Sequence, residues 1–90
     1  MNEYFDRINS IARILDSVGI PYKMNECWEG YQLRFPWCDG DVAAHDHTYE
    51  TKSGAVESYC FPWDDGDVSV LTPRAAAIKI IAYYNEEVLG

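Results

Sequence analysis

Residues 3–18 carry apolar side chains every third or fourth position, with charged and polar residues between them. This spacing places the apolar side chains on one face of a helix. Asn2 is suited to cap the start of such a helix, while Gly19 and then Pro21 are typical of its end. The sequence therefore predicts an amphipathic helix over residues 3–18.

A second helical pattern occupies residues 73–88. Thr72 is a favourable N-cap, and Pro73 suits the first helical position because that position needs no hydrogen-bond donor. The apolar stripe expected to face the core consists of Ala77, Ile80, Ile81, Tyr84 and Val88.

Between the two helices, apolar and polar residues alternate over short stretches, which is typical of half-buried strands. Glu29-Gly30 and Thr51–Gly54 are expected to be turns. The expected strands are residues 20–28, residues 31–35, the first half of 41–50, residues 55–61 and residues 68–71.

The predicted fold class is α+β, in a single domain over residues 1–90. A helix is followed by a four- to five-stranded antiparallel meander sheet and a second helix. Both helices are expected on one sheet face, because each has a single apolar stripe to bury. The other face would then stay open and carry polar residues and some of the aromatics.

One eight-residue stretch occurs twice in the chain. Residues 35–42 read Phe-Pro-Trp-Cys-Asp-Gly-Asp-Val, residues 61–68 read Phe-Pro-Trp-Asp-Asp-Gly-Asp-Val, and seven of the eight positions are identical. Asp-Gly between extended apolar segments favours a type I′ turn, in which glycine adopts a positive φ at little cost. We therefore expect hairpin tips at Asp39-Gly40 and Asp65-Gly66, with positive φ at both glycines.

The prolines of the repeat modify this expectation. Pro36 and Pro62 cannot donate to a sheet ladder, so the chain is expected to leave the sheet at each Phe-Pro-Trp and to re-enter it at Val42 and Val68. Hairpins two strands apart in a meander turn at the same end of the sheet. The two repeats should therefore lie side by side and gather their acidic residues into one patch: Asp39, Asp41, Asp64, Asp65 and Asp67.

Composition and charge narrow the classes of partner. The formal net charge is −8, which repels nucleic-acid backbones and favours a basic protein partner. The three cysteines are an odd number without CxxC spacing, as expected in a reducing compartment. No stretch has the apolar length of a membrane span, and no signal peptide precedes the first helix, so a cytoplasmic protein without a membrane partner is expected.

The aromatic residues supply the main functional signal. Tryptophan and tyrosine dominate interface hot spots, and tryptophan beside carboxylates suits a cationic partner. The first hypothesis is therefore a non-enzymatic, acidic binding module without a cofactor that docks on a basic protein. The expected binding residues are Trp37, Asp39, Asp41, Trp63, Asp64, Asp65 and Asp67. The open sheet face around Tyr31 and Tyr59 is the next candidate surface.

Two alternative functions remain open from the sequence. Trp37 and Trp63 could stack on a small molecule or a nucleotide, and the repeated Asp-Gly-Asp loops could hold a hard cation. The spacing does not match the twelve-residue calcium loop. Other combinations have no characteristic spacing either: a zinc site from Cys38, His45, His47 and Cys60, or a catalytic group from Cys38, His45 and Asp46.

The short length, the −8 charge, the helix–sheet–helix order and the Trp-x-Asp-Gly-Asp-Val motif also resemble a known class of proteins. They are similar to the small acidic accessory proteins of bacteriophages and mobile elements, which include anti-CRISPR and other anti-defence inhibitors. The resemblance implies a protein partner, such as an enzyme whose basic nucleic-acid channel is occupied by an acidic surface. It assigns no individual functional residue.

Overall fold

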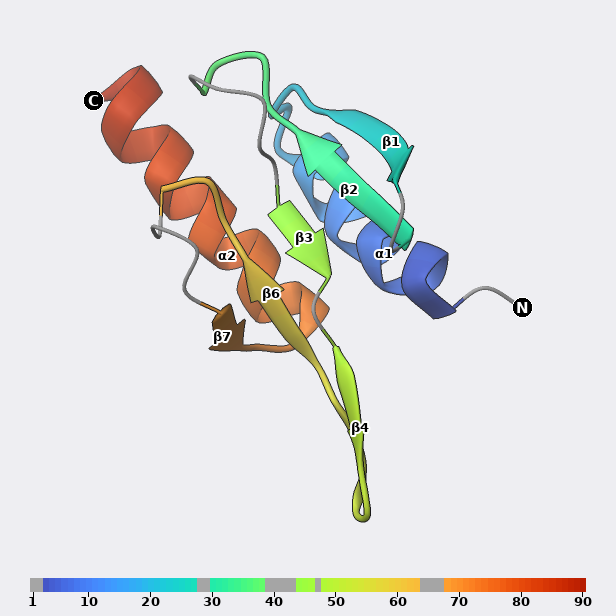
Figure 1. The fold of residues 1–90 in the computed structure, drawn as a ribbon. Helices are drawn as coiled ribbons and strands as arrows, with labels where there is room; N and C mark the ends of the chain where they lie inside the picture. Colours follow the sequence, from blue (N-terminus) through green and yellow to red (C-terminus); the bar gives the residue numbers. More distant parts are fainter. Residues whose placement is uncertain (1–2, 28–29, 39–43, 47, 64–67) are drawn as a thin grey trace.

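The computed structural model of the protein describes residues 3–27, 30–38, 44–46, 48–63 and 68–90. The structure is α+β, as the sequence predicts, with helices at both ends of the described chain and antiparallel strands between them (Figure 1). In chain order the elements are α1 (Glu3–Ser17), β1 (Lys23–Cys27), β2 (Gly30–Arg34), β3 (Ala44–Asp46), β4 (Tyr49–Thr51), β5 (Gly54–Val56), β6 (Ser58–Cys60), β7 (Val68–Val70), α2 (Pro73–Tyr84) and a π-helical segment (Asn85–Leu89).

Helix α1 ends where its sequence signals place the end. The amide of Ile20 donates to the carbonyl of Leu15 at 3.0 Å, and the amide of Gly19 donates to that of Asp16 at 3.2 Å. This is the Schellman arrangement, which requires a left-handed residue, and Gly19 supplies it with a φ of 73°. The predicted helix is confirmed to within one residue at its C-terminal end, whereas the predicted cap Asn2 lies outside the described residues.

Helix α2 begins as predicted. The Thr72 hydroxyl accepts a hydrogen bond from the amide of Ala75 at 3.1 Å, and Pro73 occupies the first turn. Ala77 and Ile80 are buried, but Val88 is 41% exposed, so the predicted stripe does not remain in the core to its end. The last residues continue as the π-helical segment rather than as α-helix.

The antiparallel strands do not form the single meander that was expected. The main sheet has the strand order β1-β2-β3-β6-β7, and β4 and β5 form a separate two-stranded ribbon. The expected strand 55–61 is therefore divided, because Val56 pairs with Tyr49 in the ribbon whereas Ser58 pairs with Val70 in the sheet. The ribbon projects away from the helices (Figure 1), and the molecule measures 42 × 25 × 22 Å.

The core lies between one face of the main sheet and both helices. Met24 of β1 pairs with Leu33 of β2, and Leu33 pairs with Ala44 of β3. Asp46, two residues after Ala44, pairs with Tyr59 of β6. Because side chains alternate along a strand, this register puts Met24, Leu33, Asp46 and Tyr59 on the same face. The largest fully buried side chains are Ile8, Ile11 and Leu15 from α1, Leu33, Tyr59 and Phe61 from the strand segments, and Ile80 from α2.

Polar contacts from both helices reach this same sheet face. The Arg7 guanidinium of α1 donates to the Asp46 carboxylate at 2.6 Å, and only 1% of the Asp46 side chain is exposed. Lys79 of α2 donates to the Ser69 hydroxyl at 3.5 Å and lies 5.0 Å from the centre of the Phe61 ring. Both helices therefore cover one face of the sheet.

Candidate binding site at the paired corners

The two Phe-Pro-Trp segments meet at one end of the sheet. Strands β2 and β6 are both antiparallel to β3, which lies between them, so both run in the same direction and end at the same edge. Phe35 and Phe61 follow directly and are 5% and 1% exposed, which anchors each segment in the core. We call residues 35–38 and 61–63 the paired corners.

Proline explains why the chain turns out of the sheet here. The amide of Cys38 donates to the carbonyl of Phe35 at 3.1 Å, which closes a four-residue turn with Pro36 at its second position. The fixed φ of proline suits that position, and its missing donor prevents continuation of the ladder. Pro62 and Trp63 likewise lie in a turn. The predicted exit from the sheet at each Phe-Pro-Trp is thus confirmed for the described residues.

The tryptophans of the two corners lie close to each other, as expected for side-by-side repeats. Their ring centroids are 6.4 Å apart, with 30° between the planes. Trp37 stacks on Phe35 at 4.7 Å and Trp63 on Phe61 at 5.4 Å. The Trp37 indole also donates to the carbonyl of Pro21 at 2.8 Å, which ties this corner to the segment after α1.

The end of α2 completes this group of rings. Tyr83 stacks on Trp63 with a centroid distance of 4.0 Å and only 5° between the planes. Tyr84 meets Trp37 edge-on at 5.0 Å. We call the resulting group the aromatic cluster: Phe35, Trp37, Phe61, Trp63, Tyr83 and Tyr84.

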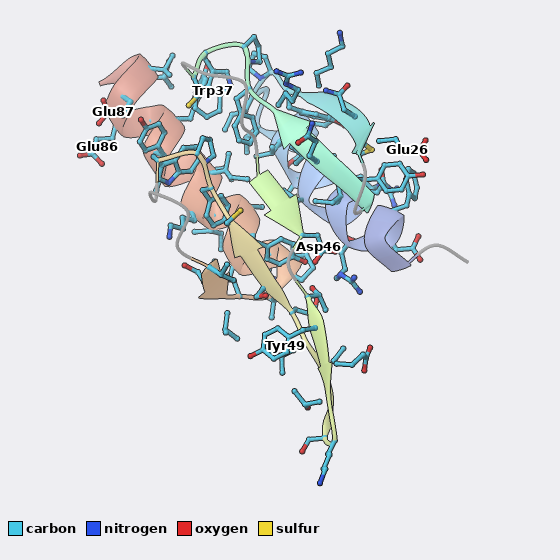
Figure 2. All side chains as sticks on the ribbon, viewed as in Figure 1. Glu26, Trp37, Asp46, Tyr49, Glu86 and Glu87 are labelled. Carbon is cyan, nitrogen blue, oxygen red and sulfur yellow. The ribbon has the colours of Figure 1, made fainter. Side chains whose placement is uncertain are left out.

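A hollow of about 310 Å³ opens beside the aromatic cluster. Glu87 lies at its edge, and both Glu86 and Glu87 are exposed on the π-helical segment that follows α2 (Figure 2). Neither the last turn of α2 nor that of the π-helical segment carries a basic residue. The hollow is lined by Trp37, Cys38, Pro62, Trp63, Tyr83, Glu87 and Val88.

Of the seven predicted binding residues, the structure brings Trp37 and Trp63 together. The other five lie outside the described residues: Asp39, Asp41, Asp64, Asp65 and Asp67. Gly40, Gly66 and the expected re-entry at Val42 lie outside them too, whereas β7 does begin at Val68. The acidic patch and the two glycine conformations therefore stay predictions.

The sequence reasoning missed Tyr83 and Glu87. Tyr84 belongs to the apolar stripe of the predicted helix, but the neighbouring Tyr83 falls outside that stripe. The signal was the Tyr-Tyr pair followed by Glu86-Glu87 near the helix end, which repeats the aromatic-then-acidic order of the corners.

The prediction that Tyr31 and Tyr59 lie on an open face of the sheet is wrong. Tyr59 is fully buried, and burial, aided by the nearby Asp46 and Glu57 carboxylates, raises the pKa of its phenol well above the ordinary value. Tyr31 packs edge-on against Phe5 of α1 at 5.3 Å. Both side chains thus face the helix layer, because the odd-numbered positions of these strand segments supply the core.

Metal ligands do not gather within the described residues. There, no group of three or more histidine, cysteine, aspartate or glutamate side chains is placed to hold a metal ion. Cys38 and Cys60 form no disulfide with another described residue, and His47 lies outside the described part of the chain. In the same part, no helix combines the length and the apolar character that a membrane crossing requires.

Comparison with models of known protein families, with curated proteins and with solved structures finds no match to this chain. The function is therefore inferred from the geometry and charge of the paired corners.

Proposed function

We propose that the protein is a non-enzymatic binding module whose paired corners dock on a basic surface of another protein. The observation that carries the proposal is the convergence of Trp37, Trp63, Tyr83 and Glu87 around one hollow. Half-buried aromatic rings next to a carboxylate offer apolar area and negative charge together. This combination suits arginine and lysine side chains of a partner, which contact rings and carboxylates alike.

The charge of the chain adds to this argument. In sequence, Asp39 follows Cys38 directly and Asp64 follows Trp63, so acidic residues continue from both corners. In sequence, acidic residues thus stand next to each corner, and the exposed Glu86 and Glu87 give the C-terminal side of the site a negative electrostatic field. Such a field accelerates encounter with a positive partner and weakens as salt rises.

The resemblance to phage accessory proteins suggests a particular kind of basic partner. We propose a nucleic-acid-handling enzyme whose positively charged channel would be occupied by the acidic, aromatic end of the sheet. The protein would then compete with the nucleic acid for the same lysine and arginine residues, because both present negative charge to them. Inhibition would require no chemistry by the protein itself.

The stacking of a small ligand between the tryptophans receives less support. Trp63 already stacks with Tyr83 and Phe61, and Trp37 with Phe35. A flat ligand would have to replace contacts that hold α2 to the corners. The partially exposed rings are better suited to meet side chains at a protein surface.

Charge reversal at the corners tests the proposal. Glu86→Lys with Glu87→Lys reverses two exposed charges at the site, and Glu26→Lys with Glu50→Lys reverses two exposed charges elsewhere. Proteins captured from a host lysate by the immobilised wild type should be retained by the second variant and lost by the first. They should also elute as salt is raised, because the contact is electrostatic. Circular dichroism establishes that both variants are folded.

Two results would contradict the proposal. Equal loss in both variants would show that only net charge matters, and unchanged capture by Glu86→Lys with Glu87→Lys would place the interface elsewhere. The variant Asp41→Lys with Asp67→Lys extends the same test to the acidic residues of the repeats.

A further inference from the structure

The projecting ribbon has an open edge along β5. Strands β5 and β6 follow each other with only Glu57 between them. On one side of this segment, β4 pairs with β5 and β3 pairs with β6. On the other side β7 pairs with β6, and the chain then leaves the sheet to begin α2. Among the described strands, none pairs with β5 on this second side.

The backbone of β5 presents hydrogen-bonding groups at this edge. The amide of Leu71 donates to the carbonyl of Glu57 at 3.1 Å, so the backbone groups of Glu57 face the β7 side. These groups alternate in direction along an antiparallel strand. The amide and carbonyl of Ala55 therefore point to the same side, beyond the end of β7. Since Ala55 is exposed, both groups are accessible to a strand of another chain.

A hollow of about 350 Å³ lies next to this edge, where β7 ends. Val70 in its lining is 66% exposed. Tyr49 of β4 is the strand partner of Val56, which also lines the hollow, and it is 51% exposed (Figure 2). An extended segment that lies along β5 would thus gain apolar contacts as well as backbone hydrogen bonds. The lining consists of Ala55, Val56, Glu57, Val70, Leu71 and Thr72.

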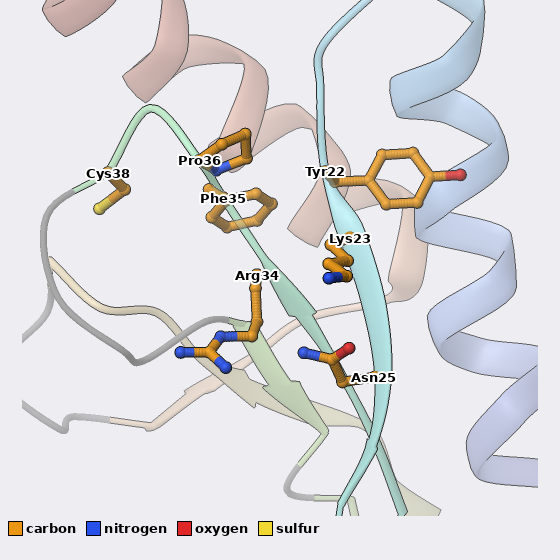
Figure 3. A pocket seen from close by; sticks show the side chains of 7 residues that line it. All are labelled: Tyr22, Lys23, Asn25, Arg34, Phe35, Pro36 and Cys38. Atoms are coloured by element: carbon orange, nitrogen blue, oxygen red, sulfur yellow. The ribbon is translucent and has the colours of Figure 1, made fainter.

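Other edges of the described strands carry charges that oppose pairing with another chain. Glu50 lies on β4, the other edge of the ribbon, whereas β1 carries Lys23 and Glu26. Lys23 already stands opposite Arg34 across the β1–β2 register (Figure 3). Charged side chains commonly protect edge strands from association. Strand β5 has none, and β7 shares this lack of charge and is therefore the competing edge.

Charge complementarity indicates that a second copy of the chain fits the β5 edge. If Ala55 lies opposite Ala55 of the second copy, each amide can donate to the other carbonyl in an antiparallel pair. The same register places Ser53 opposite Glu57, so that the neighbouring Lys52 lies near that carboxylate. A two-fold axis repeats this opposite-charge contact. Within the described part of each chain, Lys52 and Glu57 have no ion pair of their own.

From this geometry we propose that the protein self-associates through β5 as a two-fold dimer. The two ribbons join in the order β4-β5-β5-β4, and the ribbon tip of each copy occupies the hollow of the other. The contact is small, so the dissociation constant is about 0.1 mM. Because the ribbon and the paired corners adjoin opposite ends of β6, the corners of both copies stay open. The dimer does not depend on their docking role.

Sedimentation equilibrium of the wild-type protein tests for the dimer. Salt of about 0.15 M screens the long-range repulsion between two chains of net charge −8. The mass should rise from that of a monomer at about 10 µM towards that of a dimer at about 1 mM. Over the same range, the amide resonances of residues 49–57 should shift more than those of the rest of the chain.

Charge reversal tests the contact between Lys52 and Glu57. Lys52→Glu and Glu57→Lys should each weaken association about tenfold, because like charges then face each other. The variant with both changes restores opposite charges and the wild-type net charge, so it should associate like the wild type. Lys23→Glu makes the same change of charge on β1 and should leave association within about twofold of the wild type.

Ala55→Pro tests the backbone pairing. It removes the outward amide donor but no hydrogen bond to β4, because that amide faces away from β4. Association should be lost, while circular dichroism should show an unchanged fold. A wild-type monomer at about 1 mM would overturn the proposal, as would shifts centred on β7 instead of the ribbon. A folded Ala55→Pro variant that still dimerises, or a double charge variant that does not recover association, would also overturn it.

Discussion

At the scale of single residues, the buried polar groups beneath α1 differ in whether they have hydrogen-bond partners. The Asp46 carboxylate accepts hydrogen bonds from the Arg7 guanidinium at 2.6 Å and from the Thr48 amide at 2.9 Å. The Tyr59 hydroxyl lies in the same region but has no hydrogen-bond partner among the described residues. A buried hydroxyl without a partner loses its hydration and gains nothing in return, whereas a paired carboxylate is costly to disturb.

Tyr59→Phe is therefore expected to keep or slightly raise the free energy of unfolding at pH 8, by up to about 1 kcal/mol. Asp46→Ala should lower it by about 3 kcal/mol, because it removes a buried carboxylate that accepts hydrogen bonds from the Arg7 guanidinium and the Thr48 amide. Urea denaturation measures both changes. A loss above about 1 kcal/mol in Tyr59→Phe would mean that the hydroxyl has a stabilising hydrogen bond after all.

The raised pKa of Tyr59 also predicts a dependence on alkaline pH. Below the ordinary tyrosine pKa of 10.0, the phenol is protonated in both the folded and the unfolded chain, so its contribution is constant. Above that pH the unfolded chain loses the proton while the buried phenol keeps it, and stability falls as pH rises. Tyr59→Phe lacks this titration. The stability of the variant relative to wild type should therefore increase between pH 9 and pH 11, and an unchanged difference would contradict the assignment.

At the scale of elements, two glycines of the described residues have a positive φ, and the segments around them differ in how much they contact the core. Gly19, with a φ of 73°, links α1 to the buried Ile20. Gly54, with a φ of 116°, begins the second strand of the projecting ribbon, whose residues are largely exposed. A Cβ at either position would meet nothing within 4 Å, so any cost of substitution comes from the backbone conformation.

Alanine substitution should separate these two cases. Gly19→Ala is expected to lower the global free energy of unfolding by about 1 kcal/mol, because the helix end cannot open without disturbing the core. Gly54→Ala should mainly speed hydrogen exchange of the amides in residues 49–56, because a ribbon with few core contacts can open locally. Denaturation and native-state exchange measure the two effects. A larger global loss in Gly54→Ala than in Gly19→Ala would show that the ribbon is integral to the cooperative unit.

At the scale of the whole molecule, the aromatic cluster joins elements that are far apart in the sequence. Trp37 follows β2, Trp63 follows β6, and Tyr83 lies near the end of α2. The Trp63–Tyr83 stack is the closest ring pair in the cluster, with 4.0 Å between centroids. This stack holds the C-terminal helix against the corners and shapes the proposed docking surface.

A double-mutant cycle of Trp63→Ala and Tyr83→Ala should give a coupling energy of about 0.5–1.5 kcal/mol, as expected for stacked aromatic rings. Trp63→Ala combined with Ile78→Ala is the control, because Ile78 is 56% exposed and has no part in the cluster. Denaturation of all variants measures the couplings. Equal couplings in the two cycles would argue against a specific stack.

The sequence alone determined both helices and most strand positions, because their signals are local. Apolar spacing, Thr72 with Pro73, and Gly19 before Pro21 act within a few residues of each other. The repeat also indicated that Trp37 and Trp63 would be neighbours, since equivalent corners two strands apart share one end of a sheet. In each case the interactions that decide the structure lie within one segment, or they follow from the alternating direction of consecutive antiparallel strands.

Only the tertiary structure decided the features that depend on contacts between distant segments. Val56 pairs with Tyr49 in the ribbon, whereas Ser58 pairs with Val70 in the main sheet, and this change of partner divides the expected strand 55–61 and breaks the single meander. Tyr59 is buried because Asp46 and both helices share its sheet face, and Tyr83 joins the corners because α2 reaches their end of the sheet. Lys23 faces Arg34 through the register of β1 and β2. Such pairings depend on which surfaces meet after folding, and a one-dimensional pattern of polar and apolar residues does not specify them.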